Sequence, residues 1–221
     1  MKTSQRDYPL RIGAAGWDHP AWTGTFYPDD LPADWRLVYY ANEFPVVLVP
    51  AAVFATADRT ALEDWREAAE TGMRLLFELD PARSLEAQRA RAAELETGCL
   101  GLILPVSDPA RLAMQLDRLG DVVPVVADFG AAGAAEPVRE MLSQRGVGWC
   151  WHGEGPADGL APGPLGVMRV PSRGADPRRL RGWLEAGLAV QDGQRDVALI
   201  FDDDPPDVDI LRQAQTLLEL L

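Results

Sequence analysis

The chain of 221 residues has apolar and charged fractions of 47% and 25%, which exclude disordered, collagen-like and disulfide-scaffold proteins. Its formal net charge of −13 argues against binding to nucleic acid or an anionic membrane, because phosphate binding needs clustered Lys and Arg. The length allows a sizeable core in one domain, and no composition shift marks a boundary. We therefore expect residues 1–221 to form a single domain.

The cysteines and the first residues bear on the location of the protein. Cys99 and Cys150 are the only cysteines, without the spacing of a metal site. The stretch "MKTSQRDYPLRIG" lacks the apolar core of a signal peptide, and no apolar run approaches the ~20 residues of a membrane span. We expect a reducing, cytoplasmic setting in which both cysteines are small buried apolar side chains.

Strand-like and helix-like segments alternate along the chain. Eight short apolar runs predict strands, at 10–16, 45–49, 73–79, 100–104, 122–128, 147–152, 165–170 and 196–201. Helical periodicity predicts helices at 62–72, 107–120, 136–146, 175–188 and 205–221. The helix over 107–120 has Asp108 as its N-cap, Pro109 at its first position and Gly120 as its stop, and Asp176 and Pro177 begin the helix over 175–188 in the same way.

The alternation predicts an α/β fold with parallel strands joined by right-handed crossovers. Eight strands at a spacing of about 27 residues suit one compact TIM-type (β/α)8 barrel. The Gly- and Pro-rich segment 153–164 has no helical pattern, so one outer helix is expected to be missing; this segment is a mobile connector or, as the weaker alternative, a lid. An open doubly wound sheet is the competing architecture.

In a TIM-type barrel the functional residues lie at the carboxyl ends of the strands. The catalytic candidates at these positions are the carboxylates Glu78, Asp128 and Asp202. Strand alternation places Glu78 and Asp80 on the inner face of the third strand, and Arg169 on the inner face of the seventh. The candidates for ligand binding are Trp17, His19, Trp22, His152, Arg169, Arg173 and Asp203.

These residues admit several interpretations. A carboxylate–arginine pair that holds the barrel interior together is the simplest one. Two carboxylates could instead serve as general acid and base in a hydrolase or isomerase. The two histidines with nearby acids could bind a divalent metal, although no HxH or HExxH spacing supports this and we predict no metal site. Arg169 and Arg173 could hold a phosphate or carboxylate, although the acidic run 202–204 would repel an anion.

Other motifs in the sequence give little indication of a function. Gly13 and Gly16 form a G-x-x-G turn without the remaining residues of a nucleotide-binding loop, and no G-x-S-x-G elbow is present, so no cofactor is implied. The aromatic residues that follow the first strand, Trp17, Trp22 and Phe26 among them, could stack on a sugar or base. Closure of the barrel mouth as part of the core is the favoured alternative for them.

The stretch "IGAAGWDHPAWTGTFYP" (12–28) resembles the N-terminal signature of the YecE-like family, domain of unknown function 72, which reads approximately I-G-T-S-G-W-x-Y-x-x-W-x-G-x-F-Y-P. The likeness continues more thinly through "YYANEFPVVLVPAAVF", "LGLILP", "VMRV" and "ALIFDDD". The family is known as a TIM-type barrel without an established activity. The resemblance therefore implies the fold and no reaction.

Departures from the family pattern fall on polar positions. Leu48 and Pro50 stand where the family has Glu and Asn, and its Glu-Phe-Arg-His resembles the run 128–131, which keeps the acid and loses Arg and His. Of the family's Arg-x-His-Gly, this chain keeps only the arginine, as Arg169. The resemblance thus implies a divergent, shortened member that has largely lost the ancestral catalytic groups.

We accordingly predict that the barrel mouth binds a small polar ligand through Trp17, His19, Arg169, Asp128 and Asp202. One alternative is an active hydrolase or isomerase that uses a carboxylate pair or a divalent metal. Another is a structural or partner-binding barrel without a ligand site. The sequence leaves the oligomeric state open.

Overall fold

Eight parallel strands form one sheet in the computed structural model, which describes residues 10–221. The strands run β6-β5-β4-β3-β2-β1-β8-β7 across the sheet. Their bounds are β1 Arg11–Ala15, β2 Val46–Val49, β3 Arg74–Glu78, β4 Cys99–Pro105, β5 Val125–Asp128, β6 Gly148–Trp149, β7 Leu165–Val170 and β8 Asp196–Phe201. The predicted parallel pairing of the strands is confirmed.

The barrel closes between β6 and β7 through a single residue. Trp151, just beyond β6, donates its backbone N–H to the Val167 carbonyl at 3.0 Å and accepts from the Arg169 N–H at 2.9 Å. This closure makes the sheet a TIM-type barrel rather than the open doubly wound sheet.

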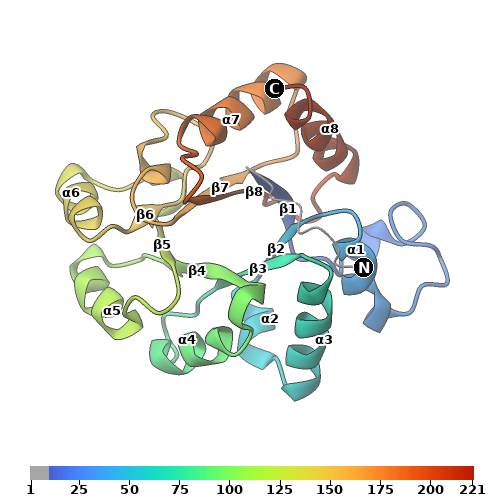
Figure 1. Ribbon diagram of the computed structural model, residues 1–221, viewed down its shortest axis with the longest axis horizontal. Helices are drawn as coiled ribbons and strands as arrows, with labels where there is room; N and C mark the ends of the chain where they lie inside the picture. The colour runs from blue at the N-terminus through green and yellow to red at the C-terminus, as the bar shows by residue number, and fades with distance from the viewer. Residues whose placement is uncertain (1–9) are drawn as a thin grey trace.

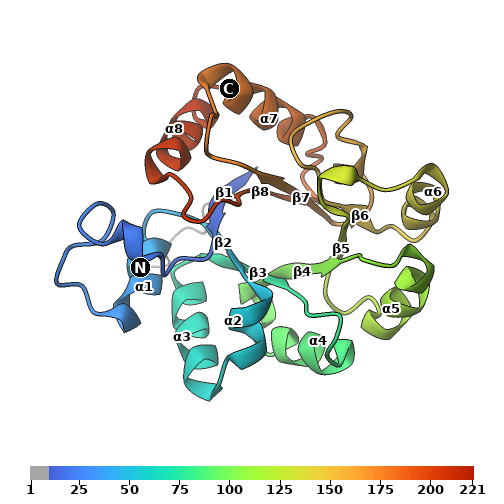
Figure 2. The same cartoon turned by 180° about the vertical axis from the view of Figure 1, so that it is seen from behind.

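Helices surround the strands (Figures 1 and 2). Their bounds are α1 Arg36–Ala41, α2 Ala51–Thr56, α3 Arg59–Glu70, α4 Leu85–Ala93, α5 Leu112–Leu119, α6 Glu136–Gln144, α7 Pro177–Ala189 and α8 Val208–Leu218. The connection from β6 to β7 contains only the 3-10 turn Asp158–Leu160, so the predicted loss of one outer helix is confirmed. The periodicity had not predicted α1, α2 or α4.

The helix signals act as the sequence indicates. Asp176 accepts hydrogen bonds at 2.9 Å from the backbone N–H groups of Arg178 and Arg179 and thus caps α7. Asp108 caps a 3-10 turn, Pro109–Arg111, which leads into α5. Gly120 ends α5 with a φ of 62°, a conformation that costs glycine little.

Strand alternation separates two apolar layers. On β3, Leu75 and Phe77 face outward and belong to the layer between strands and helices. Leu76 faces inward and belongs to the smaller layer that fills the barrel, as predicted. The barrel interior consists of Val46, Leu48, Leu76, Leu100, Ile103, Val126, Cys150, Leu165, Val167, Ala198 and Ile200.

Two of the strands, β5 and β6, are shorter than predicted by three residues or more. The run 122–128 forms a strand only from Val125, because Val122 is exposed to solvent and Pro124 has no N–H to donate to a ladder. Of the run 147–152, only the two residues of β6 form a strand. Beyond them, Trp151 alone pairs with β7, as an isolated bridge. Both strands still reach the carboxyl face of the barrel, where the candidate residues lie.

β1 and β2 are joined by a buried tyrosine next to a glycine. A Cβ at Gly13 would lie 1.8 Å from the Val46 carbonyl oxygen, so the strands can approach this closely only at a glycine. The Tyr40 hydroxyl accepts from the Ala14 N–H at 2.8 Å and donates to the Val46 carbonyl at 3.0 Å. Tyr40 therefore satisfies two backbone groups that a strand ladder leaves free.

Candidate functional site

Arg169 lies at the centre of the barrel mouth, surrounded by three carboxylates. Its Nη1 donates to Glu78 Oε1 at 2.8 Å and to Asp128 Oδ2 at 2.7 Å. Its Nε and Nη2 lie 2.9 and 2.7 Å from Asp202 Oδ2. Four of the five guanidinium N–H groups are thus directed at carboxylates of this chain. The pairing predicted inside the barrel is present, and it includes all three catalytic candidates.

The cluster carries more negative than positive charge, and its aspartates respond in opposite directions. Burial acts to raise the pKa of Asp128, but hydrogen bonding from His152 and the Arg169 charge hold it below its ordinary value. Burial raises the pKa of Asp202, and the negative charges of Glu78 and Asp128 raise it further. Together these effects exceed the lowering effect of the Arg169 charge. Although burial opposes its charge, the three carboxylates raise the pKa of Arg169, which stays ionised.

His152 is oriented by Asp128. Its Nε2 lies 2.8 Å from Asp128 Oδ1, an oxygen that also accepts from the Gly130 N–H at 2.8 Å. A carboxylate partner at Nε2 makes this nitrogen the donor and leaves Nδ1 as a free acceptor in the neutral ring. The pair therefore has the geometry of an imidazole base positioned by an acid.

A carboxylate of the chain occupies the backbone donors that follow β7. Asp203 Oδ2 accepts from the Ser172 N–H and hydroxyl and, at 3.3 Å, from the Arg173 N–H. The Arg173 side chain donates outward to the Asp204 carbonyl at 3.2 Å. A phosphate predicted here between Arg169 and Arg173 would have to displace Asp203 and compete with three acids for Arg169.

The residues after β1 divide between core and surface. Trp22 is 3% exposed, stacks on Tyr40 and donates its Nε1–H to the Pro206 carbonyl at 2.9 Å. This burial favours the alternative that the aromatic residues here belong to the core. His19 Nε2 lies 2.9 Å from the Ala15 carbonyl oxygen and Nδ1 lies 3.4 Å from Asp204 Oδ1, so both ring nitrogens have partners.

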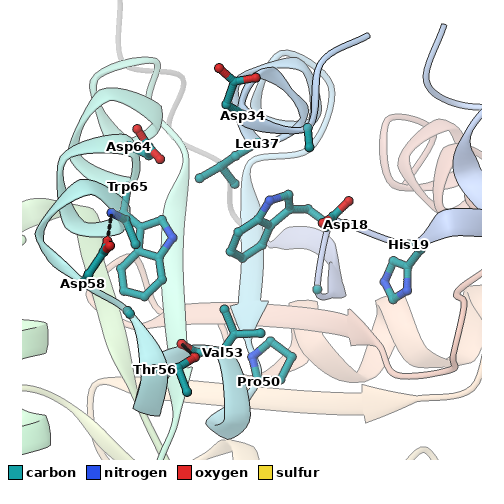
Figure 3. Close-up of a pocket in the computed structure, with 15 residues that line it drawn as sticks. Asp18, His19, Asp34, Leu37, Pro50, Val53, Thr56, Asp58, Asp64 and Trp65 are labelled. Atoms are coloured by element: carbon teal, nitrogen blue, oxygen red, sulfur yellow. Dashed lines mark hydrogen bonds between the residues drawn. The ribbon is translucent and has the colours of Figure 1, made fainter. Parts of the chain in front are cut away.

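A cavity of about 540 Å³ opens beside the mouth, between the segment after β1 and the helices α2 and α3 (Figure 3). Trp17, His19 and Pro50, the residue before α2, are among the residues that line it. Its lining consists of Gly16, Trp17, Asp18, His19, Ala33, Asp34, Leu37, Pro50, Val53, Thr56, Ala57, Asp58, Ala61, Asp64 and Trp65. This volume lies within the range of small-molecule sites.

The structure thus separates the predicted site into two parts. Trp17 and His19 line the cavity, whereas Glu78, Asp128, Asp202 and His152 surround Arg169. Asp80, expected beside Glu78 on the inner face, instead accepts from the Ala82 N–H at 2.9 Å and pairs with Arg83 at 3.3 Å in the loop after β3.

The sequence did not reveal the outer wall of the cavity. Asp34 comes from the turn before α1, Asp58 is the N-cap of α3, and Asp64 and Trp65 lie in α3. One signal in the sequence could have indicated this wall. Trp65 follows Asp64 directly, which places an apolar helix face beside acidic residues. Among residues 10–221, no three His, Cys, Asp or Glu side chains converge in the manner of a metal site.

The closed sheet, the surrounding helices and the polar groups at the carboxyl strand ends define a TIM-type barrel protein. The family model described as "Protein of unknown function DUF72" matches residues 11–119, about half of the chain. The match includes the stretch 12–28, and the resemblance drawn from that stretch to the YecE-like family, domain of unknown function 72, is confirmed. No curated protein matches the sequence.

Solved structures share the fold at low sequence identity. L-ribulose 3-epimerase is 12% identical with a TM-score of 0.58, covering 93% of this chain and 86% of that chain. 3-Hexulose-6-phosphate synthase from Salmonella typhimurium is 11% identical with a TM-score of 0.54, covering 95% and 99%. Orotidine 5'-monophosphate decarboxylase from Methanocaldococcus jannaschii is 14% identical with a TM-score of 0.54, covering 96% and 97%.

In the described residues no helix has the length and apolar character to cross a membrane.

Proposed function

We propose that this protein binds a small polar ligand at the carboxyl-terminal mouth of its barrel, in the cavity between Trp17 and Trp65. The observation that carries the proposal is the cavity itself, which joins apolar walls to several polar side chains on the functional face of the fold. Trp17 and His19 contact the ligand, and the Arg169 cluster holds the adjacent strand ends in place. Glu78 connects the two parts, because its Oε2 accepts from the Ala51 N–H at 3.2 Å at the start of α2.

The hydrogen bonds that Arg169 already makes within the chain decide which of the predicted residues can contact a ligand. With four N–H groups directed at carboxylates, Arg169 offers a ligand at most one further donor. Several structural neighbours are named for phosphorylated sugars or nucleotides. Here Asp203 occupies the backbone donors after β7, which speaks against a phosphate ligand at that place.

A panel screen tests the proposal. Amino acids, amines, sugars and sugar phosphates are added to the ¹⁵N-labelled protein, and amide shifts are followed by NMR. We expect at least one class to shift the amides of Gly16, Val53 and Ala61, and Trp17→Ala to abolish that response. Trp35→Ala is the matched control, because Trp35 is exposed and lies outside the lining. A panel that shifts none of these amides, or a response unchanged in Trp17→Ala, would overturn the proposal.

A second candidate function is acid–base catalysis at the Arg169 cluster. The specific observation in its favour is that His152 is oriented by Asp128 while Asp202 across Arg169 has a raised pKa. Groups whose environments move their pKa values apart are typical of acid and base pairs. One group could take a proton from carbon while the other donates one.

Solvent-exchange measurements test this candidate. A panel of aldoses and ketoses is incubated with the protein in D₂O, and deuterium at the carbon next to the carbonyl is followed by NMR. Catalysed exchange that disappears in His152→Ala supports the candidate. No exchange above the protein-free rate, or equal exchange in His152→Ala, contradicts it and leaves ligand binding as the function.

The cytoplasmic location expected from the sequence is part of the proposal. Cys99 and Cys150 are both free thiols, which suits a reducing compartment. Burial raises the pKa of Cys99 to about 12 and that of Cys150 well above its ordinary value, so neither thiol is activated. Cys150 is buried in the barrel interior, as expected, whereas Cys99 is only half-buried against the layer between strands and helices; both side chains serve packing.

A further inference from the structure

The cavity beside the mouth is lined by acids on one side and by apolar surface on the other. Asp18, Asp34, Asp58 and Asp64 are all among its fifteen lining residues, and none of these described residues is Lys or Arg. Figure 3 shows Asp34 and Asp64 on facing elements at one end of the cavity, with Val53 and Pro50 at the other. The cavity therefore has an acidic rim and an apolar floor.

The four aspartates are not equally engaged. Asp18 is paired with Arg36, and Asp58 caps α3 by accepting from the Ala61 N–H at 3.0 Å. Asp34 and Asp64 have no hydrogen bond or ion pair to any of the described residues. These two carboxylates are the ones free to receive a ligand group.

The basic side chains near the cavity contact groups other than Asp34 and Asp64. The Arg36 guanidinium contacts Asp18 and Thr23 and lies 5.5 Å from the centre of the Tyr27 ring. His19 is held between the Ala15 carbonyl and Asp204. Within residues 10–221, no lining side chain therefore offsets the charge of Asp34 and Asp64.

We propose that the ligand of this cavity is a small organic ammonium ion with an apolar body, its charged head between Asp34 and Asp64 and its body against Trp17 and Val53. The inference rests on the proposed function and specifies its ligand class. Carboxylates pair with ammonium N–H donors, and an indole attracts a cation through its π face. Anions are rejected by the same acids.

The electrostatics of Asp64 agree with this assignment. Burial, followed by the charges of Glu67, Asp34, Asp58 and Glu63, raises the pKa of Asp64. An ammonium ion between the acids would supply the missing opposite charge. An acid-lined cleft on an acidic protein also raises the local concentration of cations.

Three probes of nearly equal shape test the ligand class: 2-phenylethylamine, 2-phenylethanol and 3-phenylpropionate, which at pH 7 are cationic, neutral and anionic. Affinities come from calorimetry, and the site is located from the amide shifts of Val53 and Ala61. We expect the amine to bind about 10-fold more tightly than the alcohol and the acid to bind least. The amine affinity alone should fall with added salt.

Charge-removing variants locate the head of the ligand. Asp34→Asn and Asp64→Asn should each weaken the amine about 2- to 5-fold and leave the alcohol unchanged. Asp30→Asn is the matched control, because Asp30 is exposed on the same segment but outside the cavity lining. These acids make no hydrogen bonds within the described chain, so the variants should retain the fold, which a thermal unfolding curve checks.

The outcomes separate this inference from the proposed function. Equal binding of amine and alcohol at Val53 and Ala61 would overturn the cationic ligand and keep the cavity as a binding site. Preferred binding of 3-phenylpropionate would do the same. If none of the three probes shifts these amides, the cationic ligand with an apolar body fails, and the panel screen above decides separately whether the cavity binds another ligand.

Discussion

Asp128 and Arg169 are joined across the barrel by a 2.7 Å contact between Oδ2 and Nη1, although they belong to strands that are not neighbours in the sheet. Asp128 ends β5, Arg169 lies in β7, and β6 with Trp151 stands between them. The contact therefore ties together the two sides of the weakest seam of the barrel. Its effect on stability should exceed that of a surface ion pair, because both side chains are largely buried.

Removal of the Arg169 charge should destabilise the fold strongly. Arg169→Met leaves the buried Asp128 and the partly exposed Glu78 and Asp202 without this counter-charge, and we expect a loss of about 3–5 kcal/mol in the free energy of unfolding. Urea denaturation measures it. Arg173→Met, which changes an exposed arginine three residues beyond β7, should cost no more than about 0.5 kcal/mol. Equal losses in the two variants would contradict the assigned role of the cluster.

The two aspartates on Arg169 should give opposite pH dependence of stability. The folded pKa of Asp128 lies below its ordinary value of 3.8, so its stabilisation is complete above about pH 4 and is lost as the pH falls further. The folded pKa of Asp202 is raised, so its contribution is present at low pH and is lost as the pH rises through that pKa.

Urea unfolding at pH 7 and pH 3 measures the difference. Asp128→Asn should cost about 1.5–3 kcal/mol at pH 7 and less at pH 3. Asp202→Asn should cost less than Asp128→Asn at pH 7, and its cost should grow as the pH falls. Parallel changes in both variants would show that the two carboxylates share one environment.

The orientation of these groups was predictable, and their partners were not. A period of two along a strand is enough to place Glu78 and Arg169 inside the barrel. Which acid meets Arg169 depends on closure of the sheet, which brings together residues from β3, β5, β7 and the end of β8. No local pattern encodes this convergence. All three predicted carboxylates contact Arg169 because the barrel interior offers little other room.

The cavity escaped prediction because α3, which was expected, meets two short helices that were not. α2 has six residues, "AAVFAT", and its N-cap is Pro50, which has no polar side chain to signal a helix start. α1 likewise has six residues and no side-chain cap. Helices this short depend on packing rather than on propensity, so their sequences carry little periodic signal. Trp17 and His19 were found because the sequence of the first strand end is distinctive.

The Tyr40 hydroxyl should contribute measurably to stability. Tyr40→Phe removes the partner of the buried Ala14 N–H and of the Val46 carbonyl, so we expect a loss of about 1–3 kcal/mol. Tyr39→Phe changes the neighbouring, largely exposed hydroxyl and should cost no more than about 0.5 kcal/mol. Chemical denaturation of the two variants side by side checks this, and equal stability would mean that the strands close the gap without the hydroxyl.

The neutral His152 ring should be the tautomer protonated at Nε2. The carboxylate of Asp128, 2.8 Å away, can only accept, so the proton between them must belong to the imidazole. Two-bond ¹H–¹⁵N correlation spectra of the neutral ring distinguish the tautomers. In Asp128→Asn the amide can also donate, so we expect a mixed population of tautomers. A wild-type ring protonated at Nδ1 would remove the free acceptor and with it the case for His152 as a base.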